Sequence, residues 1–112
     1  MELRHYTNED GSSPFADGFA DLNPDAAAKI TVTLARFERG LFGDCEPVGE
    51  GVSEHRLHWG PGYRVYFARD GQTLILLLTG GTKRRQQKDN ETAEALWAAY
   101  KRRRGAKGDL RS

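Results

Sequence analysis

Apolar residues in the first third of the chain recur every three or four positions, which predicts helices. Two helix starts are marked by a capping residue before a proline, Ser13 before Pro14 and Asn23 before Pro24. The pattern therefore predicts two short antiparallel helices, preceded by a brief strand at residues 2–7. Their apolar positions are Phe15, Phe19 and Leu22 in the first helix, and Ala27, Ile30, Leu34, Phe37 and Leu41 in the second.

Beyond a loop at residues 43–51, which is rich in glycine and acidic residues, apolar residues alternate with polar ones. Alternation predicts strands, and the short Gly- and Pro-containing turns between them predict antiparallel pairing. The last strand is apolar on both faces, which suits a covered strand. A helix at about residues 87–103 follows, with Ala93, Leu96, Trp97 and Tyr100 on one face. The predicted strands are 52–59, 63–69 and 73–79, with turns at 60–62 and 70–71.

These elements predict one α+β domain at residues 1–104, with an N-terminal helical hairpin packed on an antiparallel sheet of three to four strands and a C-terminal helix. Residues 105–112 are expected to form a disordered basic tail. The longest apolar run, residues 74–78, is too short to span a membrane, and no signal peptide is visible. We therefore expect a cytoplasmic protein. Cys45 is the only cysteine, and its acidic neighbours disfavour a reactive thiolate.

The formal net charge of +1 hides a strong polarity along the chain. Residues 1–54 hold 4 Lys and Arg against 11 Asp and Glu, whereas residues 55–112 hold 13 against 5. A basic second half favours an anionic partner, although a solvated helix face with a basic tail would give the same count.

The first predicted hairpin allows its side chains to be assigned to the two faces of the sheet. If residues 60–62 form a three-residue loop, Trp59 lies opposite Tyr63, and neighbouring pairs follow outward. Ile75 and Leu77 are then expected on the polar face, so something should cover or bind that face. An ordinary half-exposed sheet also has a polar outer face, which leaves a purely structural role open. The apolar face would pair Leu57 with Val65 and His55 with Phe67, and the polar face His58 with Arg64, Arg56 with Tyr66 and Glu54 with Ala68.

Residues 51–67 resemble the core of RelE/ParE superfamily toxins. They are most similar to the branch called addiction module killer proteins, which is related to HigB-like toxins. In that branch a strand of the form E-x-R-x-H leads into GPGYRVYF, and a hydrophobic strand ends in GG-x-K-x-x-Q. The likeness covers about residues 15–100, and the motifs here are Glu54-His55-Arg56-Leu57-His58, Gly60-Pro61-Gly62-Tyr63-Arg64-Val65-Tyr66-Phe67 and Gly80-Gly81-Thr82-Lys83-Arg84-Arg85-Gln86.

The resemblance implies a helical hairpin on an antiparallel sheet and a toxin encoded beside its antitoxin. Many RelE-type members enter the ribosomal A site and cut messenger RNA. Carried over by position, Arg64 matches the arginine that contacts the scissile phosphate, and Arg56 and Lys83 match further basic positions. Two departures put the proton-transfer scheme in doubt. Glu54 stands where well-known members have a basic residue, and Asp89 or Asn90 stands where some have a tyrosine.

Cleavage of RNA without a metal needs a base, an acid and cations that hold the phosphate. We expect Arg64 and Lys83, with Arg56, to stabilise the phosphate, and His58 to move protons, because imidazole exchanges protons near neutral pH. Glu54 could act as base or orient Arg56, and Tyr66 could stack on a base or donate a proton. Each of these residues also has a purely structural explanation. His58 could be an ordinary surface histidine, Glu54 and Arg56 could form an ion pair on one face of the sheet, and Tyr66 could pack beside Ile75. The expected contacts to the RNA backbone are Arg84, Arg85 and Lys88.

Three functions stay open at this point. The first is a ribosome-dependent endoribonuclease, or mRNA interferase, that uses neither cofactor nor metal. The second is a ParE-like inhibitor of DNA gyrase, and the third is a decayed toxin that binds only its antitoxin. In all three we expect the partner to be a small helix-turn-helix antitoxin encoded nearby, and in the first also the ribosome and messenger RNA.

Overall fold

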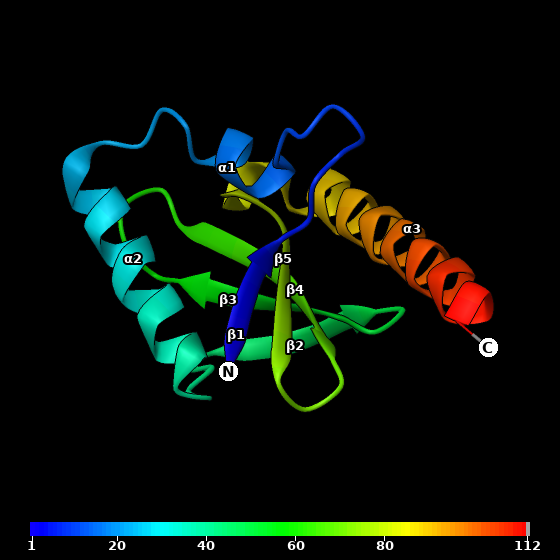
Figure 1. Cartoon of the computed structure of the whole chain (residues 1–112). Helices are drawn as coiled ribbons and strands as arrows, with labels where there is room; N and C mark the ends of the chain where they lie inside the picture. The colour runs from blue at the N-terminus through cyan, green and yellow to red at the C-terminus, as the bar shows by residue number, and fades with distance from the viewer. Residues whose placement is uncertain (112) are drawn as a thin grey trace.

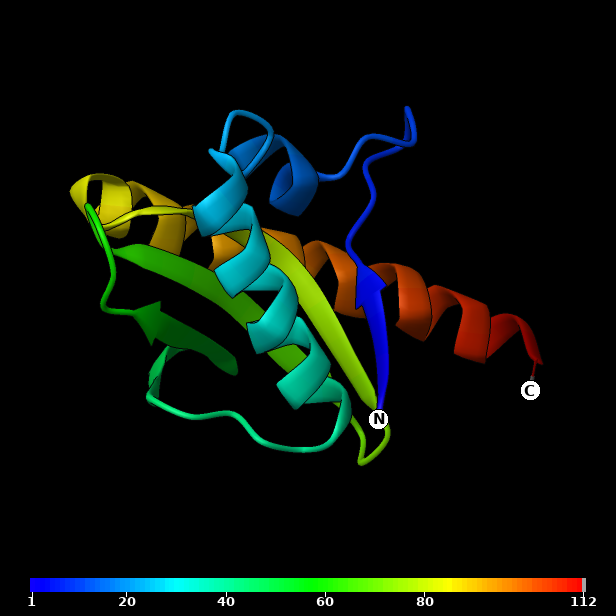
Figure 2. The ribbon, with the colours of Figure 1, turned by 90° about the vertical axis from the view of Figure 1, so that its left-hand side faces the viewer.

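The computed structural model describes residues 1–111, with the side chains of residues 1–105. A central sheet lies between two helical layers (Figures 1 and 2). Helices α1 (Pro14–Gly18) and α2 (Pro24–Glu38) cover one face, and helix α3 (Gln86–Arg111) crosses the other. The predicted α+β class, with a helical hairpin before the strands and a helix after them, is confirmed.

The sheet has five strands in the order β1-β5-β4-β3-β2. Strands β1 and β5 pair in parallel, and the other three pairs are antiparallel. The sheet is therefore mixed, whereas the sequence predicted a purely antiparallel sheet. The strands are β1 (Glu2–His5), β2 (Cys45–Gly49), β3 (Val52–Leu57), β4 (Tyr63–Asp70) and β5 (Leu74–Thr82).

Strand β2 was predicted as part of a loop. It is an edge strand that contains Pro47 and has a register shift between Pro47 and Gly49, opposite β3. Proline and glycine are tolerated at a sheet edge but hide the alternating pattern by which a strand is recognised.

Both predicted helix starts are confirmed. The Ser13 hydroxyl accepts a hydrogen bond from the Ala16 amide over 3.1 Å, and the Asn23 side-chain oxygen accepts one from the Ala26 amide over 2.9 Å. Helix α1 ends at Gly18, earlier than predicted, where its backbone meets strand β5. A Cβ on Gly18 would lie 2.1 Å from the carbonyl oxygen of Gly80, so only glycine allows this close approach.

The core consists of two apolar layers, one on each face of the sheet. One layer joins α1 and α2 to alternate residues of β4 and β5 and includes Phe15, Phe37, Val65, Phe67, Ile75 and Leu77. The other joins α3 to the intervening residues and includes Val52, Tyr66, Ala68, Leu76, Leu78 and Trp97. Strand β5 is therefore apolar on both faces because both faces are covered, as predicted.

The predicted register of the first hairpin is wrong by two residues. Leu57 pairs with Tyr63, which leaves residues 58–62 as a five-residue loop in place of the expected three. The Gly62 amide donates to the Trp59 carbonyl over 3.0 Å within that loop. A shift of two keeps each residue on its predicted face, because side chains alternate with period two. Arg56 therefore pairs with Arg64, and Glu54 with Tyr66.

Ile75 and Leu77 do not lie on the polar face. Asp70 pairs with Leu74, so three residues connect β4 to β5, and Ile75 and Leu77 face α1 and α2. The polar face instead carries Leu76 and Leu78, and helix α3 covers it. The expectation that something covers this face is thus correct. It was based on Ile75 and Leu77, which lie on the opposite face.

Helix α3 continues to Arg111, beyond the end near Arg103 that the sequence predicted. The side chains of residues 106–111 and the whole of residue 112 lie outside the described structure, and the disorder expected for the basic tail at 105–112 stays a prediction. Within the described residues, no helix combines the length and the apolar character needed to cross a membrane.

Candidate functional site

Three of the predicted site residues form a buried polar cluster under helix α3. Glu54 on β3 is 2% exposed, and Arg64 and Tyr66 on β4 are 8% and 0% exposed. The Arg64 Nη1 atom donates to the Glu54 Oε1 atom over 2.8 Å. The strand register produces this contact. Glu54 pairs with Tyr66 and Arg56 pairs with Arg64, so Glu54 and Arg64 are diagonal neighbours on one face of the sheet.

The first turns of α3 close over this cluster. The Tyr66 hydroxyl donates to the Gln86 carbonyl over 3.5 Å, and Asp89 is 4% exposed. A Cβ on Gly81 would lie 2.6 Å from the Asp89 Oδ2 atom, so glycine at this position makes room for the carboxyl. Burial raises the pKa of Asp89 above its usual range, although Arg85 and Lys88 oppose the shift.

Burial, with the nearby carboxylates of Glu54 and Asp89, also raises the pKa of Tyr66. The Tyr66 phenol therefore stays protonated at neutral pH. Several buried polar atoms of the cluster have no hydrogen-bond partner among the described residues: Glu54 Oε2, Arg64 Nε, Asp89 Oδ2 and Asn90 Oδ1. Unpaired buried polar atoms are costly, so the cluster is held together by the packing around it and not by complete hydrogen bonding.

Arg64, which the sequence analysis expects to stabilise a phosphate, is therefore not on an open surface in this structure. Helix α3 covers the face on which Arg64 lies, and Glu54 neutralises its charge. The sequence placed Arg64 on the correct face of the sheet but could not show that a helix occupies that face.

Arg56 lies at the rim of the buried cluster, with its side chain 24% exposed. It forms an ion pair with Glu46 on β2, and its Nη2 atom lies 3.6 Å from the Asp44 Oδ1 atom. Its Nε atom is 3.9 Å from the Glu54 Oε1 atom. The predicted ion pair with Glu54 is thus present but long, and the closer partners are Glu46 on β2 and Asp44 just before β2.

His58 follows the last residue of β3, and its side chain is 73% exposed. The His58 Nε2 atom lies 2.6 Å from the Asp44 Oδ2 atom. This hydrogen bond is the largest influence that lowers the pKa of Asp44. A carboxylate that holds an accessible imidazole fixes the ring and leaves the Nδ1 atom free to exchange a proton with a ligand. This carboxylate partner was not predicted from the sequence.

Four exposed cations lie at the same end of the sheet as His58: Lys83, Arg84, Arg85 and Lys88. Leu57 pairs with Tyr63, and Tyr63 pairs with Thr82, so the residues after β3 and after β5 lie on neighbouring positions. The backbone just after β3 and the backbone just after β5 are separated by two strand spacings, which is roughly 10 Å. The Lys83 amide donates to the Gly62 carbonyl over 3.0 Å, which ties the cationic turn to the loop after His58.

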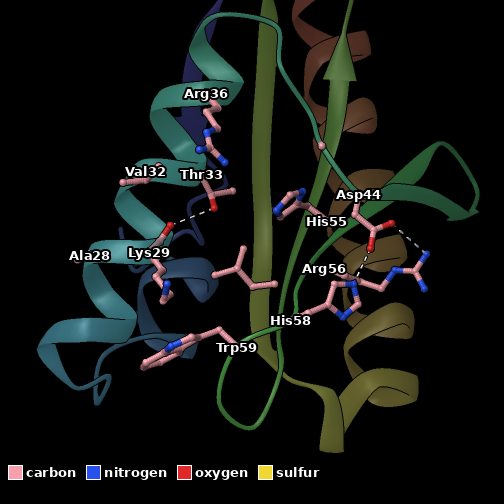
Figure 3. Close-up of a pocket in the computed structure, with 12 residues that line it drawn as sticks. Ala28, Lys29, Val32, Thr33, Arg36, Asp44, His55, Arg56, His58 and Trp59 are labelled. Carbon is pink, nitrogen blue, oxygen red and sulfur yellow. Dashed lines mark hydrogen bonds and ion pairs between the residues drawn. The ribbon is translucent and has the colours of Figure 1, made fainter.

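A cleft of about 510 Å³ opens between helix α2 and strand β3, with His58 at its rim (Figure 3). Lys29, Thr33 and Arg36 of α2 form one wall. Thr33 and Arg36 point toward the strand, and Lys29 reaches toward Trp59. His55 and Leu57 of β3 also line the cleft. Trp59 closes one end, and Asp44, His58 and Arg56 form the opposite wall.

No known family model matches the chain. A Haemophilus influenzae protein described as uncharacterized is 42% identical over 74 residues, which make up 66% of this chain and 75% of the relative. The chain belongs to the same family as that protein. The description of that relative names no activity.

Among the residues whose side chains are described, no three His, Cys, Asp or Glu residues are arranged to hold a metal ion. Cys45 and His55 approach each other, with 3.7 Å between the Sγ and Nδ1 atoms. Burial, followed by the charge of Asp44, raises the pKa of the Cys45 thiol to about 11. The thiol therefore stays protonated at neutral pH, in agreement with the sequence prediction.

The sequence analysis did not identify Asp44, Lys29, Arg36 or His55 as site residues. Lys29, Thr33 and Arg36 recur at helical spacing on α2, which indicates one shared face. Nothing in that spacing shows that the face looks onto β3. The cleft arises only when residues far apart in the chain come together in the fold.

Proposed function

We propose that this protein is the toxin of a type II toxin–antitoxin pair and cuts messenger RNA in the ribosome by metal-independent acid–base chemistry. The observation that carries this proposal is the exposed His58 imidazole, which Asp44 holds at 2.6 Å. It lies at the end of the sheet where four exposed cations gather. The resemblance of residues 51–67 to RelE/ParE toxins points in the same direction.

The chemistry is an internal attack of the 2′-oxygen on the neighbouring phosphorus. The P–O5′ bond breaks, the 2′-hydroxyl proton goes to a base, and the leaving 5′-oxygen takes a proton from an acid. His58 performs one of these transfers, because it is an accessible imidazole with a fixed orientation. Lys83 and Arg84 hold the phosphate oxygens, whose negative charge grows in the transition state.

Glu54 and Tyr66 have structural roles in this scheme. Glu54 is 2% exposed and bound to Arg64, and Tyr66 is 0% exposed with a raised pKa. Neither group reaches a substrate while α3 is in place. Arg64 would contact a phosphate only after the first turn of α3 has moved, so in this arrangement its role is to position β3 and β4 around His58.

The expected biological setting is the cytoplasm, with the ribosome and messenger RNA as targets and a small helix-turn-helix antitoxin as neutralising partner. Arg84, Arg85 and Lys88 are exposed and suited to contact an RNA backbone through counterion release. Arg56 is suited to a supporting role, because Glu46 and Asp44 already engage its guanidinium.

The test is primer extension on a messenger in a translating bacterial extract with the purified full-length protein. We expect cuts that need translation, and a loss of about 10²- to 10⁴-fold in His58→Ala. The matched control is His5→Ala, which removes an exposed histidine on β1 whose Nδ1 atom lies 3.0 Å from the Ser13 hydroxyl. Cleavage unchanged in His58→Ala would remove this residue from the chemistry.

Two other outcomes would replace the proposal. DNA damage signalling without messenger cleavage would indicate a gyrase inhibitor of the ParE kind. Neither effect, with tight binding of the neighbouring gene product, would indicate a decayed toxin. The buried Arg64–Glu54 pair is compatible with either alternative, because it removes from the surface the residue that the resemblance assigns to phosphate binding.

A further inference from the structure

The cleft between α2 and β3 has the size and the lining of a small-molecule site. Its volume of about 510 Å³ falls in the range of pockets that hold small molecules. Leu57 contributes an apolar side chain to its lining. His55, Thr33 and Trp59 add polar and aromatic groups (Figure 3). This combination suits a flat ring that also carries hydrogen-bonding groups.

The α2 wall of the cleft carries two cations whose charges are not neutralised. Among residues 1–105, no carboxylate forms an ion pair with Lys29 or Arg36, whereas Arg56 on the opposite wall is bound to Glu46 and Asp44. The charge of Arg36 acts on His55 inside the cleft. The Lys29 Nζ atom lies 5.3 Å from the centre of the Trp59 ring, which keeps the ammonium at the cleft.

We infer that this cleft binds one nucleotide of the RNA next to the cut, with its phosphate between Lys29 and Arg36 and its base over Leu57. The inference rests on the proposed function, because His58 lies between the cleft and the cations of residues 83–88, just before and in the first turn of α3. The RNA backbone then runs from Lys83 past His58 and into the cleft.

A nucleotide fits this site better than an acidic peptide. Asp44 stands on the wall opposite Lys29 and Arg36 and would repel a second carboxylate. A nucleotide places its negative charge only at the phosphate and presents both donors and acceptors at the base. Burial lowers the pKa of His55, so its imidazole is neutral at pH 7. A neutral imidazole can hydrogen-bond to a donor or to an acceptor on the base.

The test measures binding without cleavage. The probe is a fluorescein-labelled hexanucleotide with 2′-O-methyl groups, which lacks the attacking hydroxyl, titrated with the full-length protein at several salt concentrations. We expect Lys29→Gln and Arg36→Gln each to weaken binding about tenfold. Each should also reduce the slope of log affinity against log salt by about 0.7, the value for one lost contact to a single strand.

Arg39→Gln is the matched control. Arg39 is an exposed arginine at the end of the same helix and does not line the cleft, so its removal should leave both affinity and slope nearly unchanged. In addition, 5′-AMP or 5′-UMP should shift the indole N–H signal of Trp59, and Arg36→Gln should abolish that shift.

The results also separate this inference from the proposed function. Equal binding by Lys29→Gln, Arg36→Gln and Arg39→Gln would overturn the cleft as a nucleotide site, even if His58-dependent cleavage persists. Displacement of the hexanucleotide by an equal concentration of oligoglutamate would overturn it as well, because the cleft would then recognise charge alone. Binding that depends on Lys29 and Arg36, without cleavage in the extract, would keep the cleft and remove the nuclease.

Discussion

Arg64 donates to Glu54 over 2.8 Å across two adjacent strands, and their side chains are only 9% and 3% exposed. The resemblance to RelE/ParE toxins assigns Arg64 to a phosphate and places Glu54 where other members carry a basic residue. In this structure the side chains at these two positions form an ion pair with each other. A carboxylate at position 54 satisfies the buried arginine at position 64, and helix α3 packs over both.

The pair predicts a strongly non-additive effect on stability. We expect Glu54→Gln and Arg64→Met each to lower the free energy of unfolding by about 3–5 kcal/mol, because each leaves its partner buried and uncompensated. The double variant should lose less than the two single losses together. Urea unfolding of the four proteins measures this cycle.

Glu2→Gln is the control for that cycle. It breaks the Arg4–Glu2 pair, whose side chains are 62% and 55% exposed, and should change stability little. Additive losses in the Glu54 and Arg64 double variant would show that the two groups do not stabilise each other.

Asp89 predicts a specific dependence of stability on pH. Burial raises its pKa in the folded protein above the ordinary value of 3.8, so the folded state binds the proton more tightly than the unfolded chain. The stability contributed by Asp89 is complete below 3.8 and is lost as pH rises through the raised pKa. Asp89→Asn should therefore be more stable than the natural protein at pH 7.

Thermal unfolding from pH 3.5 to pH 7 measures this difference. The gap between Asp89→Asn and the natural protein should close as the pH falls toward 3.8. A gap that stays constant across this range would mean that Asp89 acts through its shape and not through its charge.

The contact between α1 and β5 predicts that Gly18 tolerates no side chain. A Cβ at Gly18 would lie 2.1 Å from the Gly80 carbonyl oxygen, which is backbone and cannot turn aside. Gly18→Ala should cost about 1–3 kcal/mol, measured by urea unfolding. Gly105→Ala meets nothing within 4 Å and is the control; it should be neutral or slightly stabilising, because alanine favours a helix. Equal stability of the two variants would show that α1 can move away from β5.

Asp44 is a positioning residue for His58 in the proposed chemistry. Asp44→Asn should lower kcat for messenger cleavage about ten- to a hundredfold with little change in KM, because RNA binding does not need the carboxylate. Asp44→Glu should recover part of the loss. A rise in KM with unchanged kcat would mean instead that Asp44 shapes the RNA-binding surface.

The helix starts were predictable because each rests on two neighbouring residues. Ser13 with Pro14, and Asn23 with Pro24, cap and begin a helix through contacts within one turn. The faces of β3 and β4 were also predictable, because alternation survives an error of two residues in register. The register itself was not, because it depends on the conformation of residues 58–62, which form a longer loop than the glycines suggested.

The candidate site was predictable as a set of residues but not as an arrangement. Glu54, Arg56, Arg64 and Tyr66 do share one face. Whether that face is open depends on α3, and α3 lies over it through contacts such as Trp97 against Gly51. Likewise, His58 gains Asp44 only because the chain before β2 returns to the end of β3, a contact that no local pattern reports.

The parallel pairing of β1 with β5 bears on how the chain folds during synthesis. Glu2 pairs with Leu74, so β1 cannot join the sheet until β5, the last of the five strands along the chain, has been made. Strand β5 lies between β1 and β4, so a nascent chain that stops before β5 has no strand on which β1 can dock. Pairings between residues far apart in the chain form slowly, since a long loop must close first. Chains that end before β5 should therefore remain open and accessible to proteases, and the complete sheet assembles only after β5 has been made.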